Sequence, residues 1–175
     1  MWLSAGRVWT IWSETMYKIR NVTPADLKQV TALEASCFPP EEAAGEAVFA
    51  FRIATFPERF FVAEEDGEIL GLVNGCASDL PAIEDRLFGP EGHEPEGKNQ
   101  MIFGLAVLPQ RQKQGIGSAL LYRMIDFARE KRMEQVILTC KAEKRSFYEK
   151  FGFVCQGVSR SAHGGARWYD MTLII

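Results

Sequence analysis

The sequence predicts one domain of the α/β (α+β) class, and three observations support that prediction. Apolar segments of strand length alternate with segments of helical periodicity along most of the 175 residues. A buried strand predicted over 101–107 leads through a loop with Gly115 and Gly117 into an amphipathic helix that ends near 129–132. The Asp66-Gly67 pair between two apolar runs is typical of a β-hairpin.

The composition argues against several classes of protein. Hydrophobic residues make up 47% and charged residues 25% of the chain, as in an ordinary globular domain. The net charge of -3 gives no reason to expect a nucleic acid, and no apolar run approaches the roughly 20 residues of a membrane span. We therefore expect neither partner. Four widely spaced cysteines within apolar segments predict reduced, buried thiols, no bound metal and a cytoplasmic location: Cys37, Cys76, Cys140 and Cys155.

The first fifteen residues differ from the rest of the chain. They hold three of the four tryptophans and lack the long apolar stretch of a signal peptide. The first strand follows directly after Met16. We expect residues 1–15 to be a disordered or artefactual leader and residues 16–175 to form one domain. Deleting 1–15 is then expected to leave activity and melting temperature nearly unchanged.

Local signals divide the start of this domain into a strand and two helices. The strand is predicted over 17–22. Thr23 and Pro24 suit the N-cap and first position of a helix, and the prolines after Phe38 end it. A second helix is predicted over 41–55 from its apolar stripe.

The remaining elements surround the central unit. Two strands are predicted over 60–63 and 68–75, followed by a polar segment over 78–99. A loop of that length in a compact domain usually has a functional reason. The last predicted elements are a strand over 135–140, a short helix over 144–150 and strands over 153–159 and 167–174.

The glycine-containing loop before the central helix has the features of an anion site. The first turn of a helix has N–H groups without internal partners, and the helix dipole adds positive charge there. Gly115 and Gly117 allow the backbone to approach a ligand closely. A pyrophosphate is the natural ligand for this arrangement. The spacing differs from the Rossmann and P-loop motifs.

The same residues resemble a known family. Gln112-x-x-Gly115-x-Gly117, preceded by Val107-x-Pro109 and followed by the aromatic segment 147–153, is similar to the acetyl-CoA pyrophosphate signature of the GNAT acyltransferase superfamily. The resemblance covers 16–175 and implies the GNAT fold, a mixed, mostly antiparallel sheet with helices on both faces. Within the superfamily the chain looks closest to microbial members of the arylalkylamine N-acetyltransferase-like branch, through segments such as Cys37-Phe38-Pro39 and Gly164-Gly165-Ala166-Arg167-Trp168-Tyr169.

The resemblance implies acetyl-CoA as cosubstrate. It places the pantetheine arm along the central strand, where that strand separates from the one ending at Cys140, and the pyrophosphate on the loop. Gln112 stands where many relatives carry arginine, so one positive charge is missing. The implied cofactor-binding residues are Leu105, Ala106, Val107, Gln112, Lys113, Gln114, Gly115, Ile116, Gly117 and Ser118.

Acetyl transfer to an amine requires positioning, a base for the amine and an acid for the thiolate. The resemblance implies Tyr148 as the acid, although Phe147-Tyr148 also suits an aromatic core pair. Glu41 resembles in position the glutamate that insect members use as a base, but an acid in a first helical turn also has a structural explanation. His93 and His163 are interpreted as solvated loop residues. A water chain to bulk solvent is the remaining alternative for the base.

Aromatic and apolar residues are predicted to form the acceptor pocket, where an aromatic amine would stack. These residues are Phe38, Pro39, Phe103 and Trp168. The expected function is acetylation of a small-molecule primary amine, for example an arylalkylamine or a polyamine, by a monomer or homodimer through direct attack in a ternary complex. Acetylation of a peptide or protein, and a non-catalytic acyl-CoA sensor, stay open as alternatives.

Overall fold

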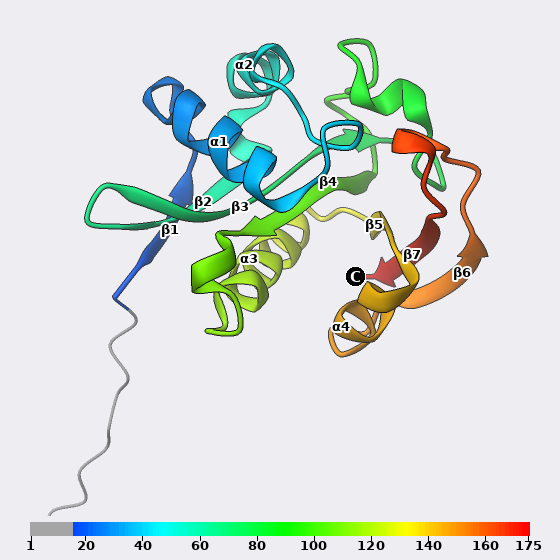
Figure 1. Cartoon of the computed structure of the whole chain (residues 1–175). Coiled ribbons are helices and arrows are strands. Elements are labelled where there is room, and N and C mark those ends of the chain that lie inside the picture. The colour runs from blue at the N-terminus through cyan, green and yellow to red at the C-terminus, as the bar shows by residue number, and fades with distance from the viewer. Residues whose placement is uncertain (1–15) are drawn as a thin grey trace, which may run out of the picture.

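The computed structural model describes residues 16–175, so the expectation for residues 1–15 lies outside the described residues. In this part of the chain seven strands form one sheet in the order β1-β2-β3-β4-β5-β7-β6 (Figure 1). β4 and β5 are parallel and all other neighbours are antiparallel, which confirms the predicted mixed, mostly antiparallel sheet. The strands are β1 (Lys18–Asn21), β2 (Phe60–Glu65), β3 (Glu68–Ser78), β4 (Asn99–Val107), β5 (Gln135–Cys140), β6 (Val154–Val158) and β7 (Tyr169–Ile174).

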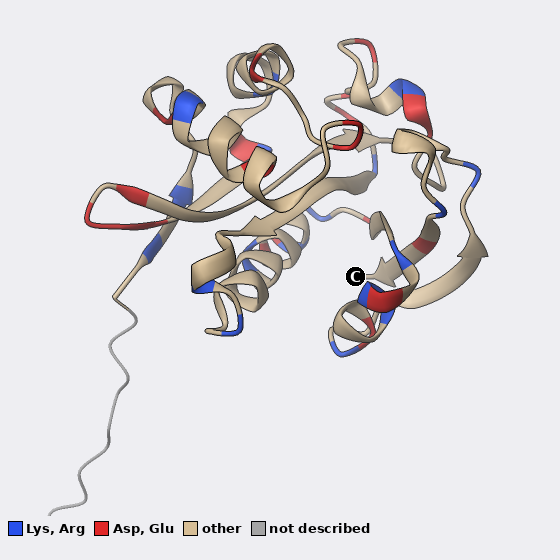
Figure 2. Ribbon diagram, in the orientation of Figure 1, with Lys and Arg blue, Asp and Glu red and all other residues tan. Residues whose placement is uncertain are grey.

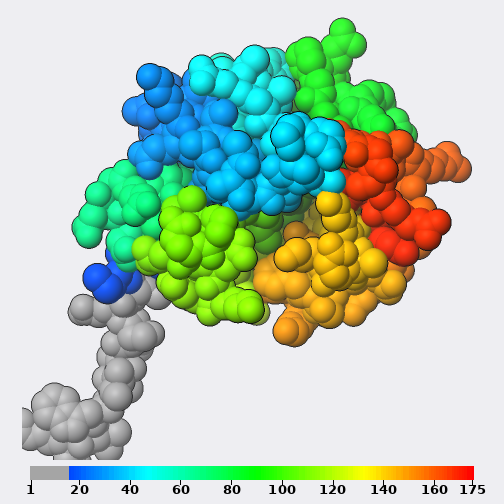
Figure 3. Space-filling model, in the orientation of Figure 1, coloured from blue at the N-terminus to red at the C-terminus, as the bar shows by residue number. Residues whose placement is uncertain are grey.

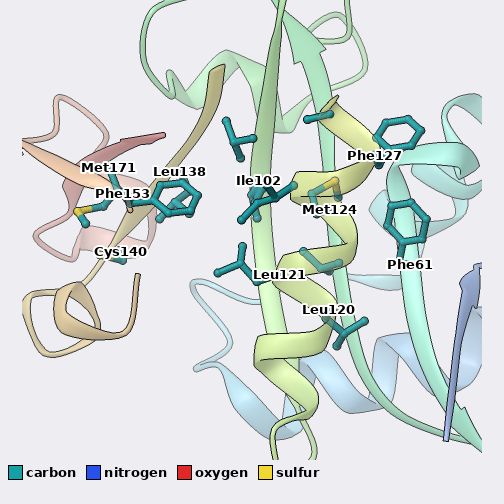
Figure 4. Packing of buried hydrophobic residues seen from close by; sticks show 14 of the residues in the cluster. Phe61, Ile102, Leu120, Leu121, Met124, Phe127, Leu138, Cys140, Phe153 and Met171 are labelled. Atoms are coloured by element: carbon teal, nitrogen blue, oxygen red, sulfur yellow. The ribbon is translucent and has the colours of Figure 1, made fainter. Parts of the chain in front are cut away.

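Helices cover both faces of the sheet, as predicted (Figure 1). They are α1 (Leu27–Cys37), α2 (Glu46–Thr55), α3 (Ile116–Glu130) and α4 (Arg145–Glu149). Alternation along β2 separates the two cores, because Val62 packs with the α1 and α2 cluster while Phe61 packs with the α3 cluster. Figure 4 shows the α3 side of the sheet, where Leu120, Leu121, Met124 and Phe127 lie close to Phe61 and Ile102.

The β2–β3 hairpin confirms the sequence-based prediction. Asp66 and Gly67 have φ angles of 49° and 83°, the left-handed conformations of the tight turn that Asp-Gly pairs favour. The strands on either side extend further than predicted, to Glu65 and Ser78.

The second helix begins five residues later than predicted, and its start explains the error. The chain after the prolines forms a turn in which the N–H groups of Glu42 and Ala43 donate to the carbonyl of Pro39 at 2.9 and 3.0 Å. Gly45, with an extended backbone, then serves as the N-cap of α2. Glu41 therefore lies in an exposed turn rather than in a first helical turn.

The long segment between β3 and β4 packs onto the sheet instead of projecting from it. Ile83 and Leu87 are buried in a third apolar cluster, and the Ser161 hydroxyl donates to the Asp85 carboxylate at 2.5 Å. His93 was expected to be solvated, which is wrong. It is partly buried against Phe56, accepts the Ala77 N–H at 3.3 Å, and has its pKa lowered by burial.

The functional surface arises where β4 and β5 diverge. Their parallel pairing runs from Asn99 with Gln135 to Ile102 with Leu138 and stops there, although β4 continues to Val107. On its other edge β4 stays paired with β3 up to Val107, with a register shift beside Asn74. The backbone over 103–107 therefore has no strand partner on the β5 side within the described chain. None of the helices in 16–175 has the length and apolar character needed to cross a membrane.

Candidate active site

A cavity of about 720 Å³ opens between the diverging strands. Figure 3 shows a hollow between α3 (lime green) and α4 (orange), beneath the blue and cyan segment of α1 and the loop before α2. We call the part around residues 112–118 and the start of α4 the loop end. The part lined by side chains such as Glu34, Arg52, Phe103 and Trp168 is called the inner end.

The loop end presents the N-terminus of α3 to the cavity. Its N-cap is Gly115, with a φ of 85°, and no side chain of the described chain caps the helix. Lys113, at a φ of 62°, also adopts the left-handed conformation that non-glycine residues rarely take. The Gln112 side chain donates to the Val107 carbonyl at 3.1 Å and holds the loop against the end of β4. The unpaired N–H groups and the dipole make this end attractive to an anion.

The two loop glycines serve different purposes. Gly115 is required by its positive φ, since a side chain there would strain the backbone. Gly117 has no such φ, and a Cβ placed on it would only reach Val107 Cγ2 at 3.6 Å, an ordinary contact. The protein itself would accept a side chain at 117. The absence of a side chain at 117 therefore makes room for a ligand in the cavity and is not required by the fold.

Basic side chains flank the loop end in two segments, the loop before α3 and the chain leading into α4 (Figure 2). Lys113 and Lys144 line the cavity. Arg111, the other basic residue of this loop, forms an ion pair with Glu65 at 2.7 Å and does not line the cavity.

Tyr148 projects into the cavity from α4. Its ring is half-buried and packs edge-on against Phe147 and Phe153, with centroids 5.1 and 5.8 Å away. Burial raises the pKa of the phenol well above its ordinary value, with a smaller contribution from Cys140. Tyr148 is therefore a protonated phenol at neutral pH.

Glu34 is the residue of the inner end that sequence reasoning missed. It lies on α1 with 5% of its surface exposed, its Oε1 accepts the Ala44 N–H at 3.2 Å, and its Oε2 has no partner among residues 16–175. Burial raises the pKa of this carboxyl, although the Ala44 hydrogen bond, Arg52 and His163 oppose the shift. The sequence does contain a feature that could have identified Glu34: it follows Val30 by four residues and thus falls on the apolar face of α1.

Arg52 lies across the same end, on α2. Its guanidinium donates to Asn74 Oδ1 at 2.8 Å and stacks on Phe103, 4.5 Å from the ring centroid. Burial lowers the pKa of Arg52 to about 10, so the side chain stays charged at neutral pH.

The inner end is covered by two segments, the turn over 39–45 and the loop around His163. We call these two segments the roof. Glu42 on the turn pairs with Lys141 at 2.7 Å, and its carbonyl is 2.9 Å from His163 Nε2. His163 also stacks on Phe88 at 4.6 Å, so the expectation of a solvated loop histidine is wrong here too. Lys141, directly after β5, lies 5.6 Å from the Trp168 ring, so the chain leading into α4 also contacts these segments.

The structure brings most of the predicted site residues together around one cavity. Those that line it are Tyr148, Leu105, Val107, Gln112, Lys113, Gly115, Gly117, Ser118, Phe38, Pro39, Phe103 and Trp168. Four others do not. Glu41 is exposed, Gln114 points elsewhere, and Ala106 and Ile116 belong to the cores on the two faces of the sheet.

The four cysteines are free thiols, and burial varies among them. Cys76 and Cys140 are buried as expected, whereas Cys37, the last residue of α1, and Cys155, on the edge strand β6, are only half-buried, so the prediction of buried thiols is wrong for these two. Between residues 16 and 175, no cluster of three or more His, Cys, Asp or Glu side chains has the geometry to hold a metal ion.

The fold and the cavity define a domain of the acyltransferase type, and comparison with known proteins places it in a family. Residues 27–153 match the Acetyltransferase (GNAT) family, and the chain belongs to that family. An uncharacterized N-acetyltransferase of Bacillus subtilis, YkwB, is 30% identical over 131 residues, which cover 68% of this chain. An N-alpha-acetyltransferase of Sulfurisphaera tokodaii is 28% identical over 141 residues, or 78% of this chain and 80% of its own length.

The match covers only part of some relatives. It spans 58% of YkwB and 25% of a second Bacillus subtilis relative, the probable hydrolase YhcX. Among solved structures, the loading GNATL domain of CurA from Lyngbya majuscula has a TM-score of 0.80 at 17% identity, covering 90% of this chain and 97% of its own. Naa50 of Arabidopsis thaliana, solved with the bisubstrate analogue CoA-Ac-MVNAL, has a TM-score of 0.69 at 20% identity and covers 90% and 98%. At these identities the structures show the shared fold.

Proposed function

We propose that this chain is an acetyl-CoA-dependent N-acetyltransferase that acetylates a small-molecule primary amine by direct attack in a ternary complex. One observation carries the proposal. Within the described residues, a single cavity joins an uncapped helix N-terminus and a free strand edge to the Tyr148 phenol and to a buried carboxylate, Glu34, of which one oxygen has no partner. Membership of the GNAT family and the CoA-containing ligand of Naa50 support the choice of cosubstrate.

The loop end fits the chemistry of CoA. The N–H groups at the start of α3 suit a pyrophosphate, and Gly117 leaves room for it on the cavity side. The unpaired backbone over 103–107 offers partners for the amides of the pantetheine arm. Lys113 and Lys144 provide positive charge for the phosphates. Acetyl-CoA, when bound, supplies an acyl group already activated as a thioester.

Two side chains are proposed for the proton transfers. The Glu34 carboxylate takes a proton from the acceptor's ammonium group, and the free amine attacks the thioester carbonyl. As the N–C bond forms and the C–S bond breaks, Tyr148 protonates the departing thiolate. The phenolate then recovers a proton from the new amide nitrogen, and Glu34 releases its proton to solvent. Glu34 replaces Glu41 in this proposal, because Glu41 does not reach the cavity.

The cavity thiols support direct transfer rather than an acylated enzyme. Cys37 and Cys140 both line the cavity. Burial raises the pKa of Cys140 to about 11, and it also raises the pKa of Cys37. Thiols of this kind are protonated at neutral pH and are poor nucleophiles.

The roofed inner end supports a small acceptor. Phe88, Phe103 and Trp168 give it an aromatic wall, which is consistent with the arylalkylamine-like branch, and the roof leaves less room for a polypeptide than an open groove would. The resemblance to an N-alpha-acetyltransferase favours a peptide amine as the second candidate. The free thiols are consistent with a cytoplasmic enzyme, acting as a monomer or homodimer.

Replacing Tyr148 with phenylalanine separates this proposal from a non-catalytic sensor. Loss of the phenol is expected to lower kcat for thiol release from acetyl-CoA by about 10²-fold or more, since general acids contribute that much. CoA affinity, measured by isothermal titration, is expected to change little because the ring still packs on Phe147 and Phe153. Unchanged turnover would remove Tyr148 from the mechanism.

A further inference from the structure

Among the residues that the structure describes, Arg52 is a buried cation without an anionic partner. Its side chain is 4% exposed, yet it lines the inner end of the cavity. Its recorded hydrogen bond goes to the neutral amide oxygen of Asn74. None of the ion pairs found within residues 16–175 involves Arg52. Buried charges are as a rule paired, because an unpaired charge loses its hydration without compensation.

The guanidinium is held in a fixed orientation. Phe103 lies beneath it at 4.5 Å and Phe49 at 5.9 Å, while Asn74 takes one of its N–H groups. A guanidinium has five N–H donors in a planar fork that matches a carboxylate. The side chain is thus ready to bind an anion without losing further conformational freedom.

A second unsatisfied charge faces the same space. Neither Glu34 Oε2 nor Asn74 Nδ2 has a hydrogen-bond partner in the described part of the chain. A Cβ added to Gly104 would lie 3.5 Å from Asn74 Nδ2 and 3.8 Å from both carboxylate oxygens of Glu34. Glycine at 104 therefore leaves open the space that these polar groups surround. Glu34 and Arg52 do not form an ion pair with each other, so each can take a ligand group of opposite charge.

We propose that the inner end binds an acceptor of the amino-acid class, with the carboxylate on Arg52 and the amino group at Glu34. This inference rests on the proposed function, because it names the substrate of that same site. An amine without a carboxylate leaves Arg52 unpaired, and a polyamine brings a second cation towards it. A peptide has no carboxylate next to its α-amine. The aromatic wall of Phe88 and Trp168 is suited to an apolar side chain.

One other reactant, the acyl donor, can carry the carboxylate that Arg52 would bind. A dicarboxylic acyl group such as succinyl would also carry an anion into the cavity. The position of Glu34 favours the acceptor, since a free carboxylate beside Arg52 is suited to an ammonium group and would repel a second anion.

The test uses three acceptors of similar shape: L-phenylalanine, L-phenylalaninamide and phenylethylamine. Acetylated products are quantified by mass spectrometry for wild type, Arg52→Gln and Arg52→Lys, with a parallel screen of the other L-amino acids. Wild type is expected to prefer free amino acids to their amides by about 30-fold or more in kcat/KM, as for a desolvated charge pair. Arg52→Gln is expected to abolish that preference, so that the ratio of kcat/KM for the amino acid to that for its amide falls to near one. Arg52→Lys is expected to restore part of it.

A binding measurement distinguishes the loss of a ligand contact from a purely structural effect of the substitution. In the presence of CoA, L-phenylalanine or the best amino acid is expected to raise the melting temperature of wild type but not of Arg52→Gln, and CoA alone is expected to stabilise both. Equal turnover of amino acid, amide and amine in wild type overturns the inference and leaves the proposed function intact. A preference for succinyl-CoA that is lost in Arg52→Gln assigns the carboxylate to the donor and also overturns it. No acetylated product from any acceptor contradicts the proposed function itself.

Discussion

The two ends of the cavity present different kinds of chemical group, backbone at the loop end and side chains at the inner end. The loop end uses backbone: the first turn of α3, the left-handed Gly115 and the unpaired edge of β4. The inner end uses side chains: the buried Glu34 on α1, the buried Arg52 on α2, which is hydrogen-bonded to Asn74 on β3, and the half-buried Phe103 on β4. Backbone N–H groups recognise a group that never changes, such as a pyrophosphate. Charged side chains can be exchanged between relatives, so they suit the part of the site that selects an acceptor.

This difference predicts that substitutions at one end leave the other end working. At the loop end the effects should appear in CoA affinity, and at the inner end in acceptor turnover. Each of the following changes is chosen to separate the two.

The largest effect is expected from Gly117→Asp. A carboxylate beside the first turn of α3 repels phosphate, and like charges brought together cost several kcal/mol, so CoA affinity should fall by about 10²- to 10³-fold. Gly117→Ala is the matched neutral change, expected to weaken CoA binding about 10-fold by obstructing the backbone approach. Because the protein has room for this Cβ, melting temperatures should stay close to wild type. Isothermal titration that returns wild-type affinity for both variants would contradict the cofactor assignment.

The second-largest effect is expected from Glu34→Gln. It keeps the size of the side chain but removes the base, and kcat should fall by about 10²- to 10⁴-fold while CoA affinity holds. Glu41→Gln tests the rival position and is expected to alter kcat by less than about 3-fold, because surface substitutions have small effects. If Glu41→Gln abolished turnover and Glu34→Gln did not, the base would have to be reassigned.

The pH profile tests the same residue in wild type. Burial raises the pKa of Glu34, with Arg52 on α2 and His163 in the roof acting against it and Cys37 nearby on α1. The base works as a carboxylate, so kcat/KM should rise with pH through this raised pKa and then level off. Glu34→Gln should lack that rise. A wild-type profile that is flat from pH 4 to 8 would speak against a buried carboxyl as the base.

A smaller effect is expected at the roof. Gly164 has a φ of 62°, and a Cβ there would lie 2.5 Å from Glu42 Cγ. Gly164→Ala should displace the turn over 39–45 and lower kcat/KM for the acceptor roughly 10-fold, since small misplacements in a site are costly. Gly165, with a φ of 69° and open space, is the control: alanine there should cost about 1–2 kcal/mol of stability from backbone strain alone. Equal acceptor kinetics in both variants would show that the roof does not shape the site.

The sequence predicted the loop end much better than the inner end, for a physical reason. Glycine spacing between a strand and a helix leaves a local pattern, so Gly115, Gly117 and the surrounding elements were predictable. The hairpin at Asp66-Gly67 was predictable for the same reason. The start of α2 was not, because the turn after Pro39 depends on hydrogen bonds to a carbonyl that no composition rule identifies.

The inner end depends on contacts between distant positions. Glu34 and Arg52 each look like one polar residue in an amphipathic helix until the fold brings them to one cavity. The aromatic residues Phe103 and Trp168 were recognised by type, but the stacking of Phe88 on His163 joins residues 75 positions apart, and no local pattern reveals it. The prediction of buried thiols was right for Cys76 and Cys140 and wrong for Cys37 and Cys155, because a helix end and an edge strand expose residues whose sequence neighbours are apolar.

The most direct test of the whole account is thiol release from acetyl-CoA by the wild-type protein, measured with and without a panel of acceptors. The panel contains arylalkylamines, polyamines, L-amino acids and a short peptide with a free N-terminus. The account predicts release that depends on a small primary amine and is accompanied by one acetylated product per thiol. If no acceptor produced thiol release while titration showed that CoA still binds, the result would contradict the account and identify the domain as an acyl-CoA sensor.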